Sequence, residues 1–244
     1  MSSICSLAHT FDCIISNTKL IKKPIPTGEE FTKANYAKFH YCVEKTDSGP
    51  RLKKSKYCGM SELTLKARGI TFIGENKGEF GGGLTAILND SEKVKLLDEN
   101  IVKLVEHDGI IYVFTGLAHL GMKRGAVYKI EIINNQPKVE RITLLNDAPE
   151  VVLSRLDSRD GIWFTIVSSE GISTFSPRFE KFNVLAVNQF WGGLYPSSAA
   201  IYENKLIIGI RSGIAVVDFN ITLHSNNRFE YRSVKKVEYY GEYQ

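Results

Sequence analysis

The sequence predicts an all-β fold, and three observations support this class. Short runs of β-branched and aromatic residues alternate with turn signals along most of the 244-residue chain. Four of these runs, starting at residues 70, 110, 162 and 206, occupy the same place in a repeated order of strands. The steps between them are 40, 52 and 44 residues, which matches the ~40–50-residue period of propeller repeats. A β-sandwich, the alternative, has no reason to repeat at this period. We therefore predict a β-propeller, with five blades of four antiparallel strands and an irregular first blade.

Residues 101–145 give the clearest copy of the repeat. A β-rich run at 101–105 precedes the turn signal His107-Asp108-Gly109, and a nearly continuous apolar run at 110–115 follows it. Such a run indicates a strand that is buried on both faces. Residues 116–124 are interpreted as a loop, 125–132 as an alternating third strand, and 139–145 as a polar fourth strand. This order describes one propeller blade.

The other copies are looser. One covers residues 67–97, another 159–185 and a third 203–233, so the recognisable repeats span residues 62–233. Residues 1–60 are less regular and are predicted to form either an irregular blade or a segment that closes the ring. Within them, residues 11–16 are interpreted as a strand that pairs with C-terminal strands, and residues 22–28 as a loop. Residues 39–44 and the basic run 51–57 are expected to be strands. The whole chain is predicted to be a single domain of 1–244.

Composition limits the class of protein. No apolar run approaches the ~18 residues that a membrane span needs, and the N-terminus lacks the positive region of a signal peptide. We therefore expect a cytoplasmic protein. Its four cysteines, Cys5, Cys13, Cys42 and Cys58, form no C-x-x-C motif and are expected to be reduced.

The aligned repeats also predict which face binds. Loops between second and third strands, at 75–81, 116–124, 168–170 and 211–212, are expected at one end of the ring, beside the Gly-rich loop 188–198. Aromatic residues next to basic ones are typical of protein-binding hot spots. The alternative for Trp191 and Phe190 is that they fill the interior or hold two blades together. The predicted partner-binding residues are Lys77, Glu79, Phe80, His119, Lys123, Arg124, Phe190, Trp191, Tyr195 and Arg211.

Catalytic and cofactor motifs have little support. The five histidines show no metal-ligand spacing, and we expect neither a metal nor another cofactor. Gly81-Gly82-Gly83 opens a strand and is followed by no P-loop lysine, which argues against a nucleotide site. Paired carboxylates remain an alternative, since a propeller hydrolase or lactonase would carry acids in a central funnel. Glu79, Glu150, Asp157 and Glu170 are available for that role.

Nucleic acid is a disfavoured partner. Residues 1–68 hold 12 Lys or Arg against 6 Asp or Glu, so the cationic excess of the chain lies there. Its densest part, residues 53–56, is more typical of a solvated sheet edge that deters aggregation. The sequence pI of about 8.7 is below the value expected of a dedicated nucleic-acid domain.

The repeats resemble β-propeller blades in general, over about 170 of the 244 residues. They lack the G-H…W-D signature of WD40 repeats and the matched glycine and aromatic pattern of kelch repeats. The resemblance implies an architecture and no active-site residues. Small single-domain propellers without catalytic motifs look like inhibitors or immunity proteins. We therefore expect a non-catalytic module that occludes another protein, such as a toxin or an enzyme with an acidic surface. A lectin-like sugar binder is a third hypothesis, although the repeats place no aromatic at one matched loop position.

Overall fold

The computed structural model describes residues 11–58, 62–88, 91–157, 161–223 and 229–242. The chain forms two compact units. Unit 1 combines residues 1–59 with 184–244, and unit 2 comprises residues 60–183. Among the described residues, no helix has the length and apolar character that crossing a membrane requires.

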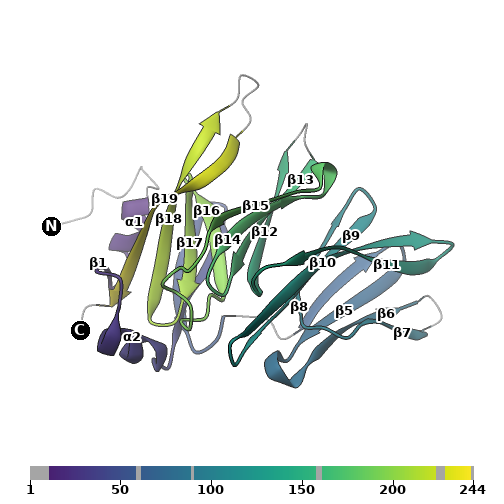
Figure 1. The fold of residues 1–244 in the computed structure, drawn as a ribbon, viewed down its shortest axis with the longest axis horizontal. Helices are drawn as coiled ribbons and strands as arrows, with labels where there is room; N and C mark the ends of the chain where they lie inside the picture. Colours follow the sequence, from purple (N-terminus) through teal and green to yellow (C-terminus); the bar gives the residue numbers. More distant parts are fainter. Residues whose placement is uncertain (1–10, 59–61, 89–90, 158–160, 224–228, 243–244) are drawn as a thin grey trace. The chain divides into compact units, whose positions relative to one another are not determined.

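Unit 2 is built from antiparallel four-stranded sheets (Figure 1). Two of them have the strand orders β4-β5-β6-β7 and β11-β10-β9-β8. A third sheet, β12-β13-β14-β15, ends with a strand that runs into unit 1. The elements are β4 (Glu62–Ala67), β5 (Ile70–Asn76), η1 (Gly78–Phe80), β6 (Gly82–Ile87), β7 (Lys93–Leu97), β8 (Ile101–His107), β9 (Ile110–His119), β10 (Met122–Ile133), β11 (Gln136–Leu145), β12 (Pro149–Asp157), β13 (Gly161–Ser168), β14 (Ile172–Ser176), η2 (Pro177–Phe179) and β15 (Lys181–Ala186).

Unit 1 contains a five-stranded sheet of order β1-β19-β18-β17-β16 and the two-stranded hairpin β2-β3. In Figure 1 the N-terminal strand β1 lies beside the C-terminal strand β19, with which it pairs from Leu20↔Glu242 to Lys23↔Tyr239. The elements are α1 (Phe11–Ser16), β1 (Leu20–Lys23), α2 (Gly28–Asn35), β2 (His40–Thr46), β3 (Gly49–Ser55), β16 (Ser198–Tyr202), β17 (Lys205–Ile210), β18 (Gly213–Leu223) and β19 (Phe229–Glu242).

This topology confirms the predicted fold class. Each four-stranded sheet consists of consecutive antiparallel strands, as a propeller blade does. The five-stranded sheet adds β1 to the consecutive strands β16–β19, and the β2-β3 hairpin supplies a shorter sheet. The fold is therefore a β-propeller of about five blades. The predicted single domain stays a prediction.

The second strands β9, β13 and β17 are buried on both faces, as their composition predicts, whereas β5 alternates buried and partly buried residues. In β9, Ile111 and Val113 belong to one buried apolar cluster and Tyr112 and Phe114 to another. Successive strand residues point to opposite faces, so β9 contributes to a core on each side of its sheet. The ring centroids of Phe114 and Phe164 lie 4.7 Å apart in the second cluster. Packing of this kind stacks sheet on sheet.

Two-residue turns set the register of the hairpins. Asp108 and Gly109 both have positive φ, at 51° and 76°, as the predicted turn requires. The predicted loop 116–124 is wrong, because the ladder of β9 and β10 continues to Met122↔His119. Leu120 and Gly121, with φ of 46° and 82°, form a tight turn at its tip. The loop is thus an extended hairpin.

The N-terminal predictions need two corrections. Residues 11–16 form the helix α1 instead of a strand, and Phe11 packs edge-on against Tyr240 at 5.7 Å. The strand that pairs with the C-terminus is β1, in a segment whose Lys22 and Lys23 were expected to lie in a loop. The N-terminal region therefore pairs with a C-terminal strand, as predicted, but it does so through residues 20–23 instead of residues 11–16.

The expectation of reduced cysteines is also wrong. Cys42 and Cys58 form a disulfide with an S–S distance of 2.11 Å, and Cys13 is disulfide-bonded as well. Cys5 lies outside the described residues. The bond joins β2 to the segment after β3, where the fold brings the two thiols together. Disulfides are typical of oxidising compartments, and the cytoplasmic location stays a prediction.

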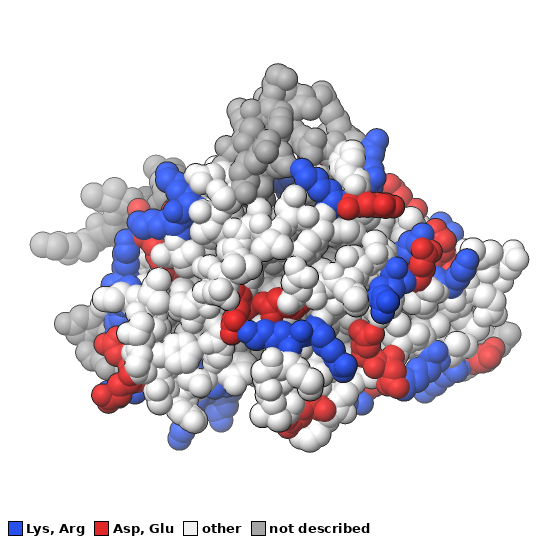
Figure 2. Space-filling view, viewed as in Figure 1, with Lys and Arg blue, Asp and Glu red and all other residues white. Residues whose placement is uncertain are grey.

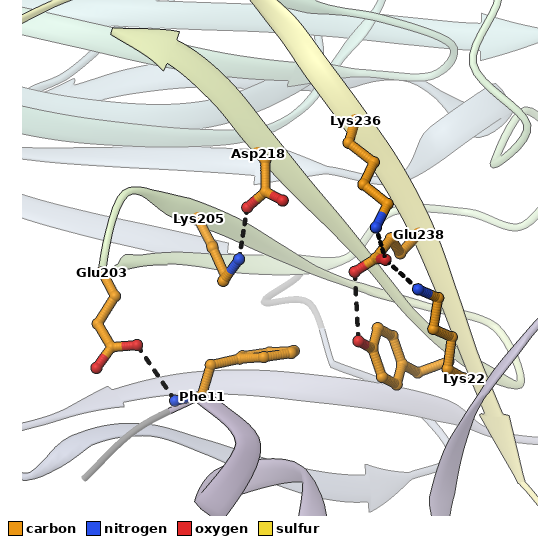
Figure 3. Close-up of polar contacts among 8 residues, drawn as sticks. Phe11, Lys22, Glu203, Lys205, Asp218, Lys236 and Glu238 are labelled. Atoms are coloured by element: carbon orange, nitrogen blue, oxygen red, sulfur yellow. Dashed lines mark hydrogen bonds and ion pairs between the residues drawn. The ribbon is translucent and has the colours of Figure 1, made fainter. Parts of the chain in front are cut away.

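A network of charged residues fastens β1 to the C-terminal sheet (Figure 3). Glu238 accepts hydrogen bonds from Lys22, from Lys236 at 2.5 Å and from the Tyr240 hydroxyl at 3.3 Å. Burial alone would raise the pKa of Glu238, but the two lysines outweigh burial and lower this pKa to about 2. On the same sheet, Lys205 pairs with Asp218 at 2.6 Å.

Glu238 is therefore expected to couple stability to pH. Its pKa is about 4.5 without these partners and about 2 in the folded protein, so its stabilising contribution is complete above pH ~4.5 and is lost as pH falls toward 2. The substitution Glu238→Gln should lower the free energy of unfolding by about 1–2 kcal/mol at pH 7, after allowance for the solvent-exposed lysines. This difference should vanish near pH 2. Urea unfolding at both pH values measures it.

The exposed pair Glu29–Lys33 supplies a matched control. Its nitrogen and oxygen lie 2.8 Å apart, and the Glu29 side chain is 81% exposed. Glu29→Gln should change the unfolding free energy by less than about 0.5 kcal/mol. Equal effects of Glu29→Gln and Glu238→Gln would show that the Glu238 network does not hold β1.

Candidate partner-binding site

One end of the unit 2 blades gathers most of the predicted binding residues. This unit 2 loop face comprises residues 77–82, 98–100, 116–124, 146–150 and 168–170. Segments 77–82, 98–100 and 116–124 together line a shallow pocket of about 100 Å³. The prediction that the 75–81 and 116–124 segments share one end of the blades is therefore confirmed within this unit.

Asn100 fixes the turn that carries η1. Its side-chain oxygen accepts a hydrogen bond from the Lys77 backbone N–H at 3.1 Å, and its Nδ2 donates to the Gly78 carbonyl at 2.7 Å. Gly82 passes so close that an added Cβ would lie 2.5 Å from Asn100 Oδ1. The neighbouring Glu99 accepts hydrogen bonds from the Thr115 and Tyr128 hydroxyls, both at 2.5 Å. The loop face therefore has a rigid base.

A contact between Glu79 and His119 joins η1 to the β9–β10 hairpin. The Glu79 Oε2 and His119 Nδ1 atoms lie 3.0 Å apart. Beside these two residues, Phe80 is 84% exposed and Leu120 is 88% exposed. Met122, the register partner of His119, is 61% exposed. Three large apolar side chains thus face solvent around one polar contact.

The cations of this face have acidic neighbours. Lys77 pairs with Glu75 at 2.9 Å and Lys123 pairs with Glu170 at 2.5 Å. Arg124 lines the small pocket together with acidic residues such as Glu79. This face therefore carries charges of both signs and is not uniformly basic, because the chain supplies carboxylates beside its own cations. Figure 2 likewise shows residues of both signs interspersed over the visible face.

Two further carboxyl groups of the loop face have contrasting surroundings. Asp147 accepts hydrogen bonds from the Ala148 N–H at 2.8 Å, the Ser169 hydroxyl at 2.6 Å and the Glu170 N–H at 2.9 Å. Glu150 lies at a bulge, where the β12–β13 register shifts between Pro149 and Val151. Burial, reinforced by the charge of Asp147, raises the pKa of Glu150 to about 8. Glu150 is therefore mostly protonated at neutral pH.

The predicted residues of unit 1 are mainly structural. Trp191 is fully buried and therefore presents no surface to a partner, in line with the alternative of an interior role. The ring centroids of Phe190 and Trp191 are 5.7 Å apart, and Phe190 is equally close to Tyr239. These rings pack the long loop 188–198 against the end of β19.

Arg211 also has an internal role. Its Nη1 donates to the Asn35 carbonyl at the end of α2, and its guanidinium carbon lies 4.4 Å from the centre of the Tyr195 ring. Tyr195 is 51% exposed and is the predicted unit 1 residue most accessible to a partner. The partner-binding role of Tyr195, like that of the unit 2 residues, stays a prediction.

Sequence reasoning did not single out several residues of this site. Asn100, Glu99 and Asp147 stand in junctions between blades, where polar residues are ordinary. Leu120 and Met122 fell within the predicted loop 116–124 without being named. The sequence contained one signal for this turn. Leu120, a large apolar residue, stands directly before Gly121, a position that tight turns usually give to Asn or Asp. Among the described residues, no three His, Cys, Asp or Glu side chains cluster as a metal site.

Comparison with known proteins yields structural neighbours only. No family model and no curated protein matches the sequence. One similar structure is a GH43 glycoside hydrolase engineered for endo-xylanase and exo-arabinofuranosidase activity, at 8% identity and a TM-score of 0.37. Another is the extracellular domain assigned to a one-component system of B. thetaiotaomicron, at 13% identity and 0.41. A third comes from a nidogen/laminin complex, at 8% identity and 0.29.

The chain spans less than half of the first two neighbours. The match covers 71% of this chain and 41% of the hydrolase, and 84% of this chain and 32% of the extracellular domain. For the third, it covers 82% of this chain and 92% of the other. Similarity at this level is limited to the arrangement of strands.

Glu150 gives a second test of pH dependence, of opposite sign to that of Glu238. Between pH ~4.5 and ~8 the unfolded chain ionises at this residue while the folded protein keeps the proton, so stability falls as pH rises. Glu150→Gln should match the wild type at pH 4 and exceed its unfolding free energy by about 2–4 kcal/mol at pH 9. Glu106→Gln, at an exposed position of the same unit, is the control for removing a carboxyl group. Parallel curves for Glu150→Gln and wild type would contradict the raised pKa of the Glu150 carboxyl.

Proposed function

We propose that the protein is a non-catalytic binding module that engages another protein through the unit 2 loop face. The observation that supports this most is the exposure of Phe80, Leu120 and Met122 around the Glu79–His119 contact. Large apolar side chains on a rigid base, surrounded by polar residues, are typical of the centre of an interface.

The backbone at Leu120 supports the same proposal. A bulky residue at positive φ is strained, and here its side chain is 88% exposed. Backbone strain at an exposed residue is often retained for function. A partner that covered Leu120 would bury apolar surface that folding leaves in water.

From the loop face we infer the kind of surface that the partner presents. The bound surface would be apolar at its centre and carry both signs of charge at its rim, opposite Lys123, Glu170 and Arg124. An inhibitor or immunity protein for a toxin or enzyme is one form of this proposal. In that form, the partner would lose activity when bound.

Alanine substitutions at the apolar centre test the proposal. Phe80→Ala/Leu120→Ala should weaken binding of the partner at least about 30-fold, the equivalent of ~2 kcal/mol. The matched control is Leu144→Ala/Leu156→Ala, because these leucines of the same unit are 63% and 69% exposed. The partner is recovered from native extract with the wild type, and its affinity for all three proteins is then measured. Assaying the activity of that partner with and without the wild type tests the inhibitor form.

If the partner bound the two double variants with equal affinity, binding through the unit 2 loop face would be refuted. Circular dichroism and unfolding midpoints of the variants must first match those of the wild type. All four substituted side chains are mostly exposed, so we expect little change in stability.

A hydrolase is the second candidate, and one observation favours it. Asp147 and Glu150 are carboxyl groups whose surroundings differ, which is a pattern of general acid–base pairs. This proposal predicts turnover of a panel of nitrophenyl esters and glycosides, lowered at least about 100-fold by Glu150→Gln. Absence of turnover in the wild type, or turnover unchanged by Glu150→Gln, would reject it.

A further inference from the structure

Unit 1 contains a groove of about 470 Å³ between α2 and the end of the C-terminal sheet. We call it the α2 groove. One turn of α2 lines one wall with Glu30, Lys33 and Ala34, which share a face of the helix at spacings of three and four residues. Lys23 and the two prolines of the β1–α2 connection line another wall. Phe39, Ser212, Tyr239 and Glu242 line the remainder.

The walls of the α2 groove are held in place from behind. Arg211 donates to the Asn35 carbonyl and so fixes the C-terminal end of α2. Lys23 is the register partner of Tyr239, which sets the β1 wall against β19. Tyr239 is 6% exposed and packs against the Phe190 ring. The groove is therefore preformed, which lowers the entropic cost of binding a ligand.

The lining carries charges of both signs. The side chains of Lys23 and Glu30 make no hydrogen bond or ion pair within the described parts of the chain, so both are available to a ligand. The Lys33 side chain pairs with the exposed Glu29 at 2.8 Å and with no other residue that the structure describes. Glu242 accepts hydrogen bonds from Lys54 at 2.7 Å and from Tyr41 at 2.5 Å. Burial raises the pKa of Glu242, but these two donors outweigh it and leave the pKa lowered, so Glu242 is ionised at neutral pH.

Neutral parts of the lining complete the site. Pro24, Pro26 and Phe39 give an apolar surface, and the Ser212 and Tyr239 hydroxyl oxygens lie 3.3 Å apart. Small-molecule sites are typically preformed concavities of ~300–1,000 Å³ with an apolar lining and a few polar groups that orient the ligand. The α2 groove has the size and the composition of such a site.

We propose that the α2 groove binds a small zwitterion with an apolar side chain, namely a free amino acid or a dipeptide. The ligand carboxylate pairs with Lys23 and Lys33, and its ammonium group pairs with Glu30 and Glu242. Its side chain packs on Pro24 and Phe39. A simple anion such as phosphate is disfavoured, because the two carboxylates of the lining would repel it.

The dipeptide Leu-Phe and free phenylalanine are the probes. Each is titrated up to about 10 mM into the wild-type protein, and nuclear magnetic resonance follows the backbone amides. We expect saturable shifts at residues 23–37 and 239–242. N-acetyl-Leu-Phe and Leu-Phe-amide each lack one terminal charge and should bind at least about tenfold more weakly. Stronger binding of Leu-Phe than of phenylalanine identifies a peptide ligand, and the reverse identifies an amino acid.

Substitutions locate the site. Lys23→Gln and Glu30→Gln should each weaken binding of the better probe at least about tenfold. The matched control is Lys45→Gln/Asp47→Asn, which removes one charge of each sign from exposed positions on the β2–β3 hairpin and should leave binding unchanged. Wild type that shows no saturable shift with either probe overturns the proposal. So does binding that is unaffected by both groove substitutions, or that is equally tight for the blocked peptides.

The α2 groove and the proposed protein-binding face can fail independently. The Phe80→Ala/Leu120→Ala variant alters unit 2 alone and should bind the zwitterion like the wild type. Lys23→Gln should in turn retain the protein partner.

Discussion

The structure depends on the burial of the second strands β9, β13 and β17 on both faces. Ile111 and Val113 of β9 pack into one core while Tyr112 and Phe114 pack into another, so neither face of the sheet is left for solvent. An isolated sheet of this kind would expose a full apolar face, and stacking of sheets is the way to bury it. Because sheet faces are taken up by packing, contacts with other molecules are left to strand ends and turns. The exposed apolar residues of the unit 2 loop face stand at such positions.

The regular blades were predictable for the same physical reason. A strand buried on both sides must be apolar throughout, and this makes the runs at 70, 110, 162 and 206 visible and equally placed. Turn residues such as Asp108-Gly109 also predicted where each hairpin turns, and therefore which residues pair across it. The extended β9–β10 hairpin was missed because Gly116 interrupts the apolar run and residues 117–124 show no regular alternation of apolar and polar side chains. There the ladder is imposed by the strands it continues.

The N-terminal segment could not be read from local sequence. Residues 11–16 contain two isoleucines and a cysteine, a composition that suits a strand, and six residues are too few for a helical period to appear. Lys22 and Lys23 resemble a solvated loop until Glu238, far along the chain, provides a partner for Lys22. The Cys42–Cys58 bond likewise depends on the folded path of the chain after β3, which the spacing of the two cysteines does not reveal.

The predicted binding residues show what composition can and cannot tell about a surface. A Gly-rich loop with three aromatic residues is compatible with an interface or with an internal plug, and the full burial of Trp191 places it with the second. Arg211 is similarly engaged by the end of α2. Leu120 presents the reverse case, since it lies at positive φ with its side chain in water. Folding alone would favour glycine or asparagine at that turn and a polar side chain at that exposure. A contact outside the molecule would account for a leucine there, and this is the physical reason why we propose the loop face of unit 2 as the partner-binding surface.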